Sequence, residues 1–424
     1  MCKHSVGIVA LLLLGILFAS CAGPGGRARP GAVEPSIRVC LSESTGELLF
    51  EAGSAVIVLA PGRRAVFENP VTMSCSVNDD GRIELRSASG DTVTVGGALR
   101  MYTKVHDGSI SFEKREYSDT LLLATDGERL YLINILPLER YLYGVLPNEI
   151  GRNRKPSDIA AVEAQAILAR TYALNKIRLP LTRLFDVYDD ARDQVFSGKG
   201  AQDPTSTAAV QKTRGLVVTQ NGQPAECYYH STCGGSTEHP SNVWSRHQSA
   251  GHLTGIRDKE KRRSFCAISP SFRWTEIYTR SAMENVLRTW LPSANEAIKE
   301  TDIPGENWYL LDINLLKRSQ SGRVTTVQIV MGNRAQQRSY YVHADRIRRA
   351  LRRPDGTPLR STLFDIHLER NAQRWISLIR IDGGGNGHGV GMCQWGAISR
   401  SREGQSPERI LQAYFPGTRL RTMY

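Results

Sequence analysis

Short alternating strand patterns over residues 36–135 constrain the fold of this chain more than any other feature. Apolar and polar residues alternate in brief runs there, as in Ser36–Leu41, Ala55–Leu59, Arg82–Leu85 and Thr92–Val95. The turn-forming pairs Asp80-Gly81, Asp107-Gly108 and Asp126-Gly127 separate such runs. The pattern predicts an all-β region built from hairpins.

A strong helical pattern comes after this β-rich region. Pro156, Ser157 and Asp158 are a typical helix start, with Ser157 placed to cap the first turn. Apolar residues then recur at helical spacing at positions 159, 162, 166, 169 and 173, with a second apolar face at Leu168 and Tyr172. We therefore expect a helix that is buried on most sides.

Further patterns mix helix and strand. Asn221-Gly222 predicts a hairpin, and residues 270–370 predict a helix from about Arg280 to Trp290, a strand over Val324–Met331 and a helix over Ala344–Leu351. The fold class is therefore α+β. A β-rich N-terminal part, residues 36–135, precedes a mixed α/β, catalytic-like core, residues 136–424, that carries an inserted mixed segment at about 270–370.

The N-terminus indicates export. Lys3 and His4 precede an apolar run from Val6 to Ala19, which has the length of a signal-peptide core and is short for a membrane span. The segment Leu17–Cys21 resembles a bacterial lipoprotein box, so residues 1–21 are expected to be a lipoprotein signal peptide with lipidation at Cys21. A plain cleaved signal is the alternative.

The Gly- and Pro-rich residues 22–35 then form a flexible tether. We expect an exported lipoprotein that faces the periplasm or cell wall and contacts the membrane through its lipid anchor only.

Composition limits the partners. The 424 residues are 41% hydrophobic and 23% charged, as in soluble globular proteins, and the formal net charge is +12. This charge favours polyanionic surroundings, including a carboxylate-bearing polymer. The basic residues are scattered, without zinc-finger spacing or a long basic arm, so no nucleic-acid partner is expected.

Three motifs carry a family resemblance. They cover residues 138–150 with 161–173, residues 228–237, and residues 385–397 with 410–418. In this order and spacing they resemble the stage II sporulation protein D family and its relatives called amidase enhancers. The resemblance covers roughly residues 110–270 and 375–424.

The resemblance implies an activity. Sporulation proteins of this type are lytic transglycosylases that cut peptidoglycan glycan strands stripped of their stem peptides and leave 1,6-anhydro ends. Their catalytic acid matches Glu149. One carboxylic acid suffices for this chemistry, because it first protonates the leaving oxygen and then takes the proton of the C6 hydroxyl. Hydrolysis would need a second carboxylate.

Other functions stay open. The apolar neighbours of Glu149 favour a raised pKa, whereas an exposed loop glutamate or an N-terminal charge on the next helix is the structural alternative. From the family's other name, the rival function is a non-catalytic peptidoglycan-binding enhancer of a cell-wall amidase.

Two polar residues of the long helix are candidates for substrate binding. Arg170 lies in a mostly apolar helix and needs an anion. That anion is Glu163 or Asp186 if the role is structural, and Glu149 or a sugar carboxylate if the role is functional. Gln165 is either a helix-packing hydrogen-bond partner or a site residue.

The second and third motifs supply further candidates for substrate binding, which are His230, Ser231, His388 and Gln394. His230 and Ser231 precede a Gly-Gly pair, where polar side chains often face a ligand. No G-x-S-x-G elbow accompanies them, so a serine nucleophile is not expected. The glycines around His388 allow close approach of a substrate, although His388 alternatively bonds only its own loop.

Six cysteines follow the leader, at positions 40, 75, 227, 233, 266 and 393. In an exported chain an even number suggests disulfides. The favoured pair is Cys233–Cys266. The alternative is a structural zinc on Cys227, His230 and Cys233 with Cys266 or Cys393, although strand alternation puts Cys227 and His230 on opposite faces. No other cofactor is expected, and the zinc stretch of some relatives, matched by Val187–Val195, has no Cys or His here.

Overall fold

The computed structural model describes residues 33–68, 71–180, 182–244, 251–294 and 307–424. The expected signal peptide, most of the tether and Cys21 lie outside these residues. The fold is α+β, as the sequence patterns predict. No helix within the described ranges is both long and apolar enough to cross a membrane.

The N-terminal part consists of two largely antiparallel sheets. The first has seven strands, in the order β13 (Val187–Tyr188), β1 (Ser36–Ser44), β12 (Leu130–Pro137), β11 (Thr120–Thr125), β8 (Ala98–Thr103), β3 (Val56–Ala60) and β4 (Arg63–Phe67). The second has six strands, in the order β10 (Arg115–Tyr117), β9 (Ile110–Phe112), β2 (Leu48–Ala52), β5 (Val71–Val77), β6 (Ile83–Ser87) and β7 (Thr92–Val95).

The alternating pattern of the sequence becomes the two faces of these sheets. In β2 (Leu48–Ala52), for example, buried and exposed residues alternate without exception, so one face packs into the core. Asp80-Gly81 and Asp126-Gly127 connect paired antiparallel strands, β5 to β6 and β11 to β12, as expected of hairpin turns. Asp107-Gly108 differs, because it connects β8 to β9, which belong to different sheets. The hairpin prediction is therefore confirmed for two of the three Asp-Gly pairs and wrong for the third.

A helical layer follows. It contains α1 (Leu138–Ile150), α2 (Ile159–Arg178), α3 (Pro204–Lys212), α6 (Gln394–Arg402) and α7 (Pro407–Tyr414). Small sheets accompany these helices, namely β15 (Gln223–Pro224), β14 (Leu216–Gln220) and β26 (Arg419–Thr422), the parallel pair β16 (Tyr229–His230) and β25 (Met392–Cys393), and the hairpin β17 (Lys259–Glu260) and β18 (Arg263–Ser264). Short 3₁₀ turns are η1 (Pro156–Asp158), η2 (Lys199–Ala201), η3 (Pro240–Asn242) and η4 (Phe265–Ile268).

The start of the long helix differs from the expected one. Ser157 does not cap it, because residues 156–158 form the 3₁₀ turn η1 and α2 begins at Ile159. Asp158 takes the N-cap position without a capping bond, and its carboxylate instead pairs with Arg402 of α6 at 2.6 Å. The expectation of burial on most sides is confirmed, since thirteen residues between Ala161 and Leu174 are buried.

Residues 274–383 form a lobe with a hydrophobic core of its own. Its elements are β19 (Trp274–Thr279), β24 (Ile376–Gly383), β23 (Phe364–Arg370), β20 (Tyr309–Arg318), β21 (Val324–Gly332), β22 (Gln337–His343), α4 (Arg280–Ala294) and α5 (Arg346–Ala350). The predicted strand corresponds to β21 and the two predicted helices to α4 and α5.

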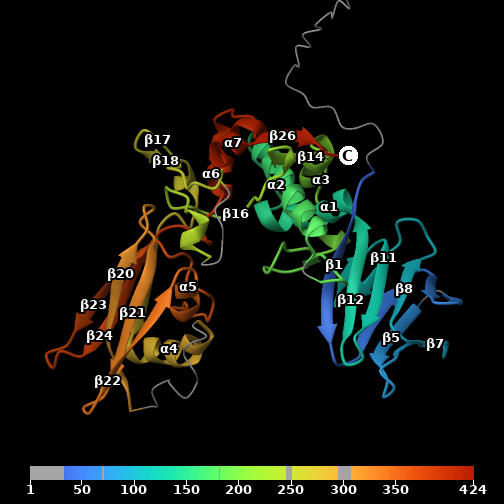
Figure 1. Cartoon of the computed structure of the whole chain (residues 1–424), viewed down its shortest axis with the longest axis horizontal. Coiled ribbons are helices and arrows are strands. Elements are labelled where there is room, and N and C mark those ends of the chain that lie inside the picture. Colours follow the sequence, from blue (N-terminus) through green and yellow to red (C-terminus); the bar gives the residue numbers. More distant parts are fainter. Residues whose placement is uncertain (1–32, 69–70, 181, 245–250, 295–306) are drawn as a thin grey trace, which may run out of the picture.

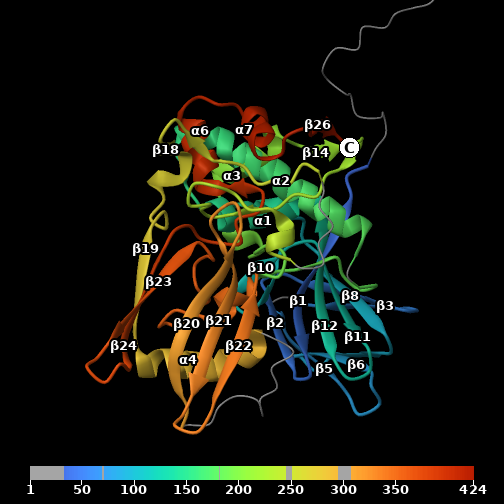
Figure 2. The same ribbon diagram turned by 60° about the vertical axis from the view of Figure 1, so that its left-hand side comes forward.

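The helical layer lies across one end of both β-rich parts. Figures 1 and 2 show the N-terminal sheets, in blue and teal, and the orange lobe below the green and red helices. The segments that precede and follow the lobe in the sequence meet in this layer. The strand β16 pairs in parallel with β25, with Tyr229 opposite Met392 and His230 opposite Cys393. Residues 228–230 and 388–393 are thereby brought together.

Candidate functional site

Glu149 lies in the last turn of α1 and is half-buried. The backbone N–H of Val195 donates a hydrogen bond to its Oε1 over 3.2 Å. The Tyr229 hydroxyl is a second hydrogen-bonding neighbour of this carboxylate. Within the described parts of the chain no arginine, lysine or histidine forms an ion pair with Glu149, so its charge is not compensated.

This environment sets the acidity of the carboxyl group. Burial raises the pKa of Glu149 from its ordinary 4.5 to about 7, although the hydrogen bonds from Val195 and Tyr229 act in the opposite direction. The carboxyl is therefore a mixture of acid and carboxylate at neutral pH. This is the state that a group needs if it is to donate a proton and then accept one.

A groove of about 860 Å³ has Tyr229 in its wall, and the hydroxyl of this tyrosine connects the groove to the Glu149 carboxylate, which is not itself a lining residue. The groove is bounded by α2 and the loop at 190–193 on one side, and by α5 of the inserted lobe on the other. Its lining residues are Tyr172, Asp190, Ala191, Arg192, Asp193, Tyr228, Tyr229, Trp244, Asp345, Arg348, Arg349 and His388.

Aromatic rings cover one wall of the groove. The ring centroids of Tyr228 and Trp244 are 4.6 Å apart, and those of Trp244 and His388 are 5.2 Å apart. Tyr172 and Tyr229 extend this surface toward Glu149, because both tyrosines line the groove and the Tyr229 hydroxyl reaches the carboxylate. Flat apolar faces with polar edges suit the ring faces and hydroxyls of sugars.

The carboxylates that line the groove differ from Glu149 in that each has a cationic partner. Asp190 pairs with Arg192 at 2.8 Å, and Asp345 pairs with Arg348 at 3.2 Å. Asp193 pairs with a lysine of α2 at 2.6 Å and also accepts bonds from the Tyr172 hydroxyl and a backbone N–H. Each of these three acids therefore has an ion-pair partner, which Glu149 lacks among the described residues.

The position of His388 is compatible with both alternatives considered for it. It lines the groove, and its Nδ1 accepts a bond from the Val390 N–H over 3.1 Å. The proton of the neutral ring is therefore on Nε2, and the ring has a second bond to the backbone of Tyr229. Burial lowers the pKa of His388 to about 4, so the ring is neutral at pH 7.

His230 and Ser231 do not line this groove. His230 is buried, its Nδ1 lies 3.0 Å from the Val390 carbonyl, and burial lowers its pKa far below the ordinary value. Its ring packs edge-on against His388, with centroids 5.6 Å apart. Ser231 bonds the hydroxyl of Thr232 at 3.3 Å and accepts the Trp395 N–H with its carbonyl. Of the two residues, His230 contacts a ring of the aromatic wall and Ser231 does not.

Arg170 is fully buried and its partner is Glu139 of α1, at 2.8 and 2.7 Å. Its remaining donors bond the carbonyls of Val210 and Leu216. The proposed partners Glu163 and Asp186 are wrong, because Lys212 and Arg38 take them. Burial and full bonding leave no donor for a substrate or for Glu149, which corrects the expected substrate-binding role.

Gln165 and Gln394 lie together inside the helical layer. The Gln394 Nε2 donates to the Gln165 Oε1 over 3.4 Å, which connects the first motif to the third. Both side chains are buried, and among the described residues the Gln165 Nε2 has no hydrogen-bond partner. The pair joins α2 to α6 and does not line the groove, so the packing alternative considered for Gln165 matches its position.

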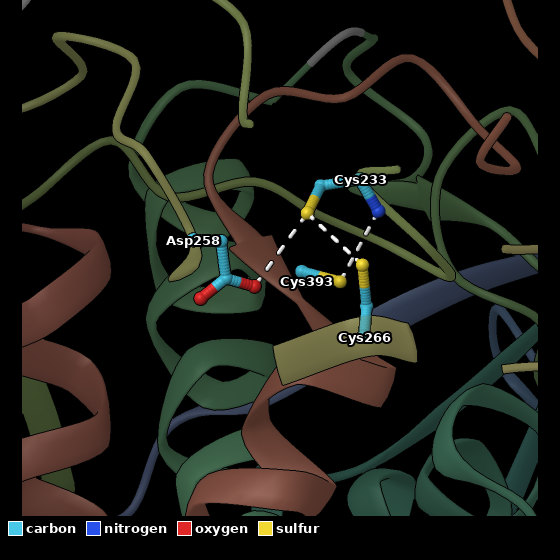
Figure 3. A group of neighbouring side chains, drawn as sticks. All are labelled: Cys233, Asp258, Cys266 and Cys393. Carbon is cyan, nitrogen blue, oxygen red and sulfur yellow. Dashed lines mark hydrogen bonds between the residues drawn. The ribbon is translucent and has the colours of Figure 1, made fainter. Parts of the chain in front are cut away.

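The cysteine pair expected to be a disulfide is not bonded. The sulfurs of Cys233 and Cys266 are 3.4 Å apart, and both residues are free thiols. Cys393 and Asp258 complete a buried group whose ligand atoms all lie within 4.8 Å of one another (Figure 3). Cys227 is not a member, so the zinc set considered with Cys227 and His230 is wrong as well.

Several groove residues had no signal in the sequence. Trp244 and Arg349 belong to no motif and reach the groove only through the tertiary fold. Tyr229 lies inside a motif, but its contact with Glu149 depends on the β16–β25 pairing. Gln194, which donates to the Tyr229 hydroxyl over 2.9 Å, comes from the loop after β13.

Comparisons with known proteins agree with this arrangement. Residues 126–220, which include α1, α2 and Glu149, match the family described as Stage II sporulation protein. Residues 248–391, which include the inserted lobe, match a domain of unknown function, DUF8618.

Relatives that align with most of the chain extend these matches. An uncharacterized protein of Brachyspira hyodysenteriae is 28% identical over 71% of this chain and 71% of its own length. The amidase enhancer of Bacillus subtilis is 27% identical over 84% of this chain, which spans only 52% of that protein. Stage II sporulation protein D of Bacillus subtilis is 26% identical over 67% of this chain and 74% of its own length. Residues 126–220 therefore match the stage II sporulation protein family, and the resemblance seen in the motifs is confirmed by this match and by relatives of 26–28% identity.

Proposed function

We propose that this protein acts on peptidoglycan as a lytic transglycosylase, which cleaves glycan strands free of stem peptides with Glu149 as the only acid–base group. The observation that carries the proposal is the state of this carboxyl group. It is desolvated, it has no cationic partner among the described residues, and its pKa is raised to about 7 beside an aromatic groove.

The reaction needs one group in two protonation states. Glu149 in its acid form donates its proton to the glycosidic oxygen as the bond from C1 to that oxygen breaks. The resulting carboxylate then takes the proton of the C6 hydroxyl on the same sugar, whose oxygen bonds C1. The product is a 1,6-anhydro end, no water is consumed, and Glu149 returns to its acid form.

The other groove acids support this reaction over hydrolysis. A hydrolase needs a second carboxylate, either to activate water or to form a glycosyl intermediate. Asp190, Asp193 and Asp345 are each held by a cation. Such pairing occupies the carboxylate oxygens that would attack the sugar or accept a proton from water.

The groove also suits the chemistry of a stem-free glycan. Its sugars carry acetamido groups and, after the stem is removed, lactyl carboxylates. The rings of Tyr228 and Trp244 offer stacking faces. Arg349, on the exposed side of α5, has no acidic partner among the described residues and is suited to bind a lactyl carboxylate.

A second function is favoured by one comparison. The relative that covers the largest share of this chain among those compared is named an amidase enhancer. In that case the same groove holds glycan without cutting it, and the partner is a cell-wall amidase. In either case we propose an exported protein, anchored through a lipid on Cys21, with no nucleic-acid partner.

The test is digestion of stem-free glycan strands by the full chain, with mass analysis for anhydro ends. Glu149→Gln keeps the size and polarity of the side chain but cannot cycle a proton, so turnover should fall by about 10²–10⁴-fold while glycan binding persists. Asp190→Asn is the matched control, because it neutralises a groove carboxylate already paired with Arg192, and it should keep most of the activity.

Binding is tested separately from turnover. Arg349→Ala should weaken binding of stem-free glycan but not of intact peptidoglycan, whereas Arg346→Ala, on the same helix but outside the groove lining, should not. Full activity in Glu149→Gln would refute the catalytic role. Inactivity of the unmodified protein, together with stimulation of an amidase, would establish the enhancer function instead.

A further inference from the structure

Four buried side chains meet next to the β16–β25 strand pair. Cys233 follows β16, Asp258 precedes β17, Cys266 lies in η4 and Cys393 ends β25. They come from four separate segments, and Figure 3 shows them pointing toward one another. None of them lines the groove, so the cluster is separate from the site described above.

The spacing of the ligand atoms matches a small tetrahedral cation. The sulfurs of Cys233 and Cys266 are 3.4 Å apart, and the Cys233 sulfur is 3.5 Å from the Asp258 Oδ2. Tetrahedral zinc with bonds of about 2.3 Å to sulfur requires ligand separations of about 3.8 Å. A disulfide would use two of the sulfurs and leave the third beside a buried carboxylate with no role.

Backbone donors surround the sulfurs, as they do at thiolates. The N–H groups of Gly235 and Gly396 donate to the sulfurs of Cys233 and Cys393, each over 3.3 Å. The Cys393 sulfur also accepts the Cys233 N–H over 3.2 Å. Glycine is required next to Cys233, since Gly234 and Gly235 have φ of 76° and 120°, which a side chain disfavours.

Two side chains outside the cluster hold the Asp258 carboxylate in place by hydrogen bonds. The Arg400 Nη2 donates to the Asp258 Oδ1 over 3.0 Å, and the Tyr414 hydroxyl donates to Oδ2 over 2.8 Å. Ligands of structural metals are usually fixed by such second contacts. Gly396 is needed here too, because a Cβ at this position would lie 2.3 Å from the Asp258 Oδ2.

Two buried arginines balance the charge. Zinc with three thiolates and a carboxylate has a net charge of −2 from its formal charges. Arg400 pairs with Asp258, and Arg323 is fully buried with its Nη2 bonded to the Cys233 carbonyl over 2.8 Å. Within the described ranges Arg323 has no ion pair, although a buried guanidinium requires a nearby negative charge.

We propose that Cys233, Asp258, Cys266 and Cys393 form a closed structural zinc site. Three thiolates and a carboxylate are a ligand set that zinc accepts, and four protein ligands leave no position for a reacting water. The site joins the segment after His230 to the segment after Met392, and therefore stabilises the β16–β25 strand pair. This pair contains Tyr229, and His388 lies just before β25 in the sequence. It is independent of whether the groove cleaves glycan or only binds it.

The test is metal analysis of the full chain purified without a polyhistidine tag. We expect one zinc ion per chain, released when a mercurial reagent modifies the thiols. Cys393→Ser should lose the zinc while keeping a capping acceptor for α6, and Asp258→Asn should weaken its retention against a chelator. Cys227→Ala is the matched control, a buried cysteine outside the cluster, and should keep the zinc.

A second measurement avoids dependence on the folding of the variants. Cobalt added to the metal-stripped, unmodified protein should give thiolate-to-cobalt absorption, and chelator treatment should lower the Tm of that protein. A preparation without zinc, in which peptide mapping shows a Cys233–Cys266 disulfide, would overturn the proposal. So would stoichiometric iron or copper, or full zinc retention in Cys393→Ser.

Discussion

Glu149→Gln should stabilise the protein at high pH while it abolishes turnover. Burial raises the pKa of Glu149 from 4.5 to about 7, so the folded state binds this proton more tightly than the unfolded state. Below pH 4.5 Glu149 is protonated in both the folded and the unfolded state, so its titration does not change the free energy of unfolding. Between pH 4.5 and about 7 the unfolded state has lost this proton and the folded state keeps it, so the free energy of unfolding falls. Above about 7 the folded state holds an unpaired buried charge, and the loss reaches its full size.

The size of the effect follows from the two pKa values. Their difference corresponds to a loss of up to roughly 3 kcal/mol at pH 8, at about 1.4 kcal/mol per pH unit. Glutamine has no charge to desolvate and avoids this loss. The variant should therefore match the unmodified protein at pH 4 and exceed its free energy of unfolding by as much as about 3 kcal/mol at pH 8.

Urea denaturation followed by circular dichroism at pH 4, 6 and 8 measures this difference. Asp190→Asn is the control, because Arg192 lowers the pKa of Asp190 and its neutralisation should not stabilise the fold at pH 8. A Glu149→Gln protein that is no more stable than the unmodified one at pH 8 would refute the reasoning. A gain that is the same at every pH would do so too, since it could not come from the charge.

Three further experiments test other parts of the chain. Cys21→Ser should move the protein from the membrane fraction to the soluble fraction in cell fractionation, and unchanged fractionation would exclude lipidation there. Arg170→Met should cost about 3–5 kcal/mol in thermal or urea unfolding, because Glu139 is left buried without its cation. Adding Glu139→Leu should recover part of that loss, and no recovery would contradict the ion-pair explanation. Trp244→Ala and His388→Ala should each weaken binding of stem-free glycan in titration calorimetry without loss of helical content; unaltered affinity in both would remove the aromatic wall from the site.

Local patterns were sufficient for much of the fold. Alternation and Asp-Gly turns predict the hairpins of residues 36–135, and helical spacing predicts α2 because its burial is nearly continuous. The helix α1 was not predicted. Pro147 lies inside it and Gly144 packs against Phe196, so the segment lacks the composition of a helix and depends on tertiary contacts.

The candidate site is only partly predictable from the sequence, because several of its contacts also depend on the tertiary fold. A motif identifies Glu149. The partner of Arg170 is Glu139 in helix α1, which the sequence patterns do not predict, so the sequence analysis names acids that are closer to Arg170 in the sequence. Cys233, Cys266 and Cys393 are all named in the zinc alternative drawn from the sequence, whereas Asp258 belongs to no motif and joins them only through folding. Sequence spacing does not report such contacts, because they depend on the register of β16 against β25.

The return of the chain to the helical layer after the inserted lobe has a consequence for the order of folding. β14 pairs with β26, roughly two hundred residues later, and Glu139 bonds the hydroxyl of Tyr424. The lobe, in contrast, closes its own core from residues within 274–381. Contacts between distant residues form slowly, so we expect refolding in two phases, with the lobe first and the helical layer last. Stopped-flow fluorescence with Trp308 in the lobe and Trp395 in the helical layer, each as the only tryptophan, should separate the two phases. A single common rate would mean that the lobe and the layer fold as one cooperative unit.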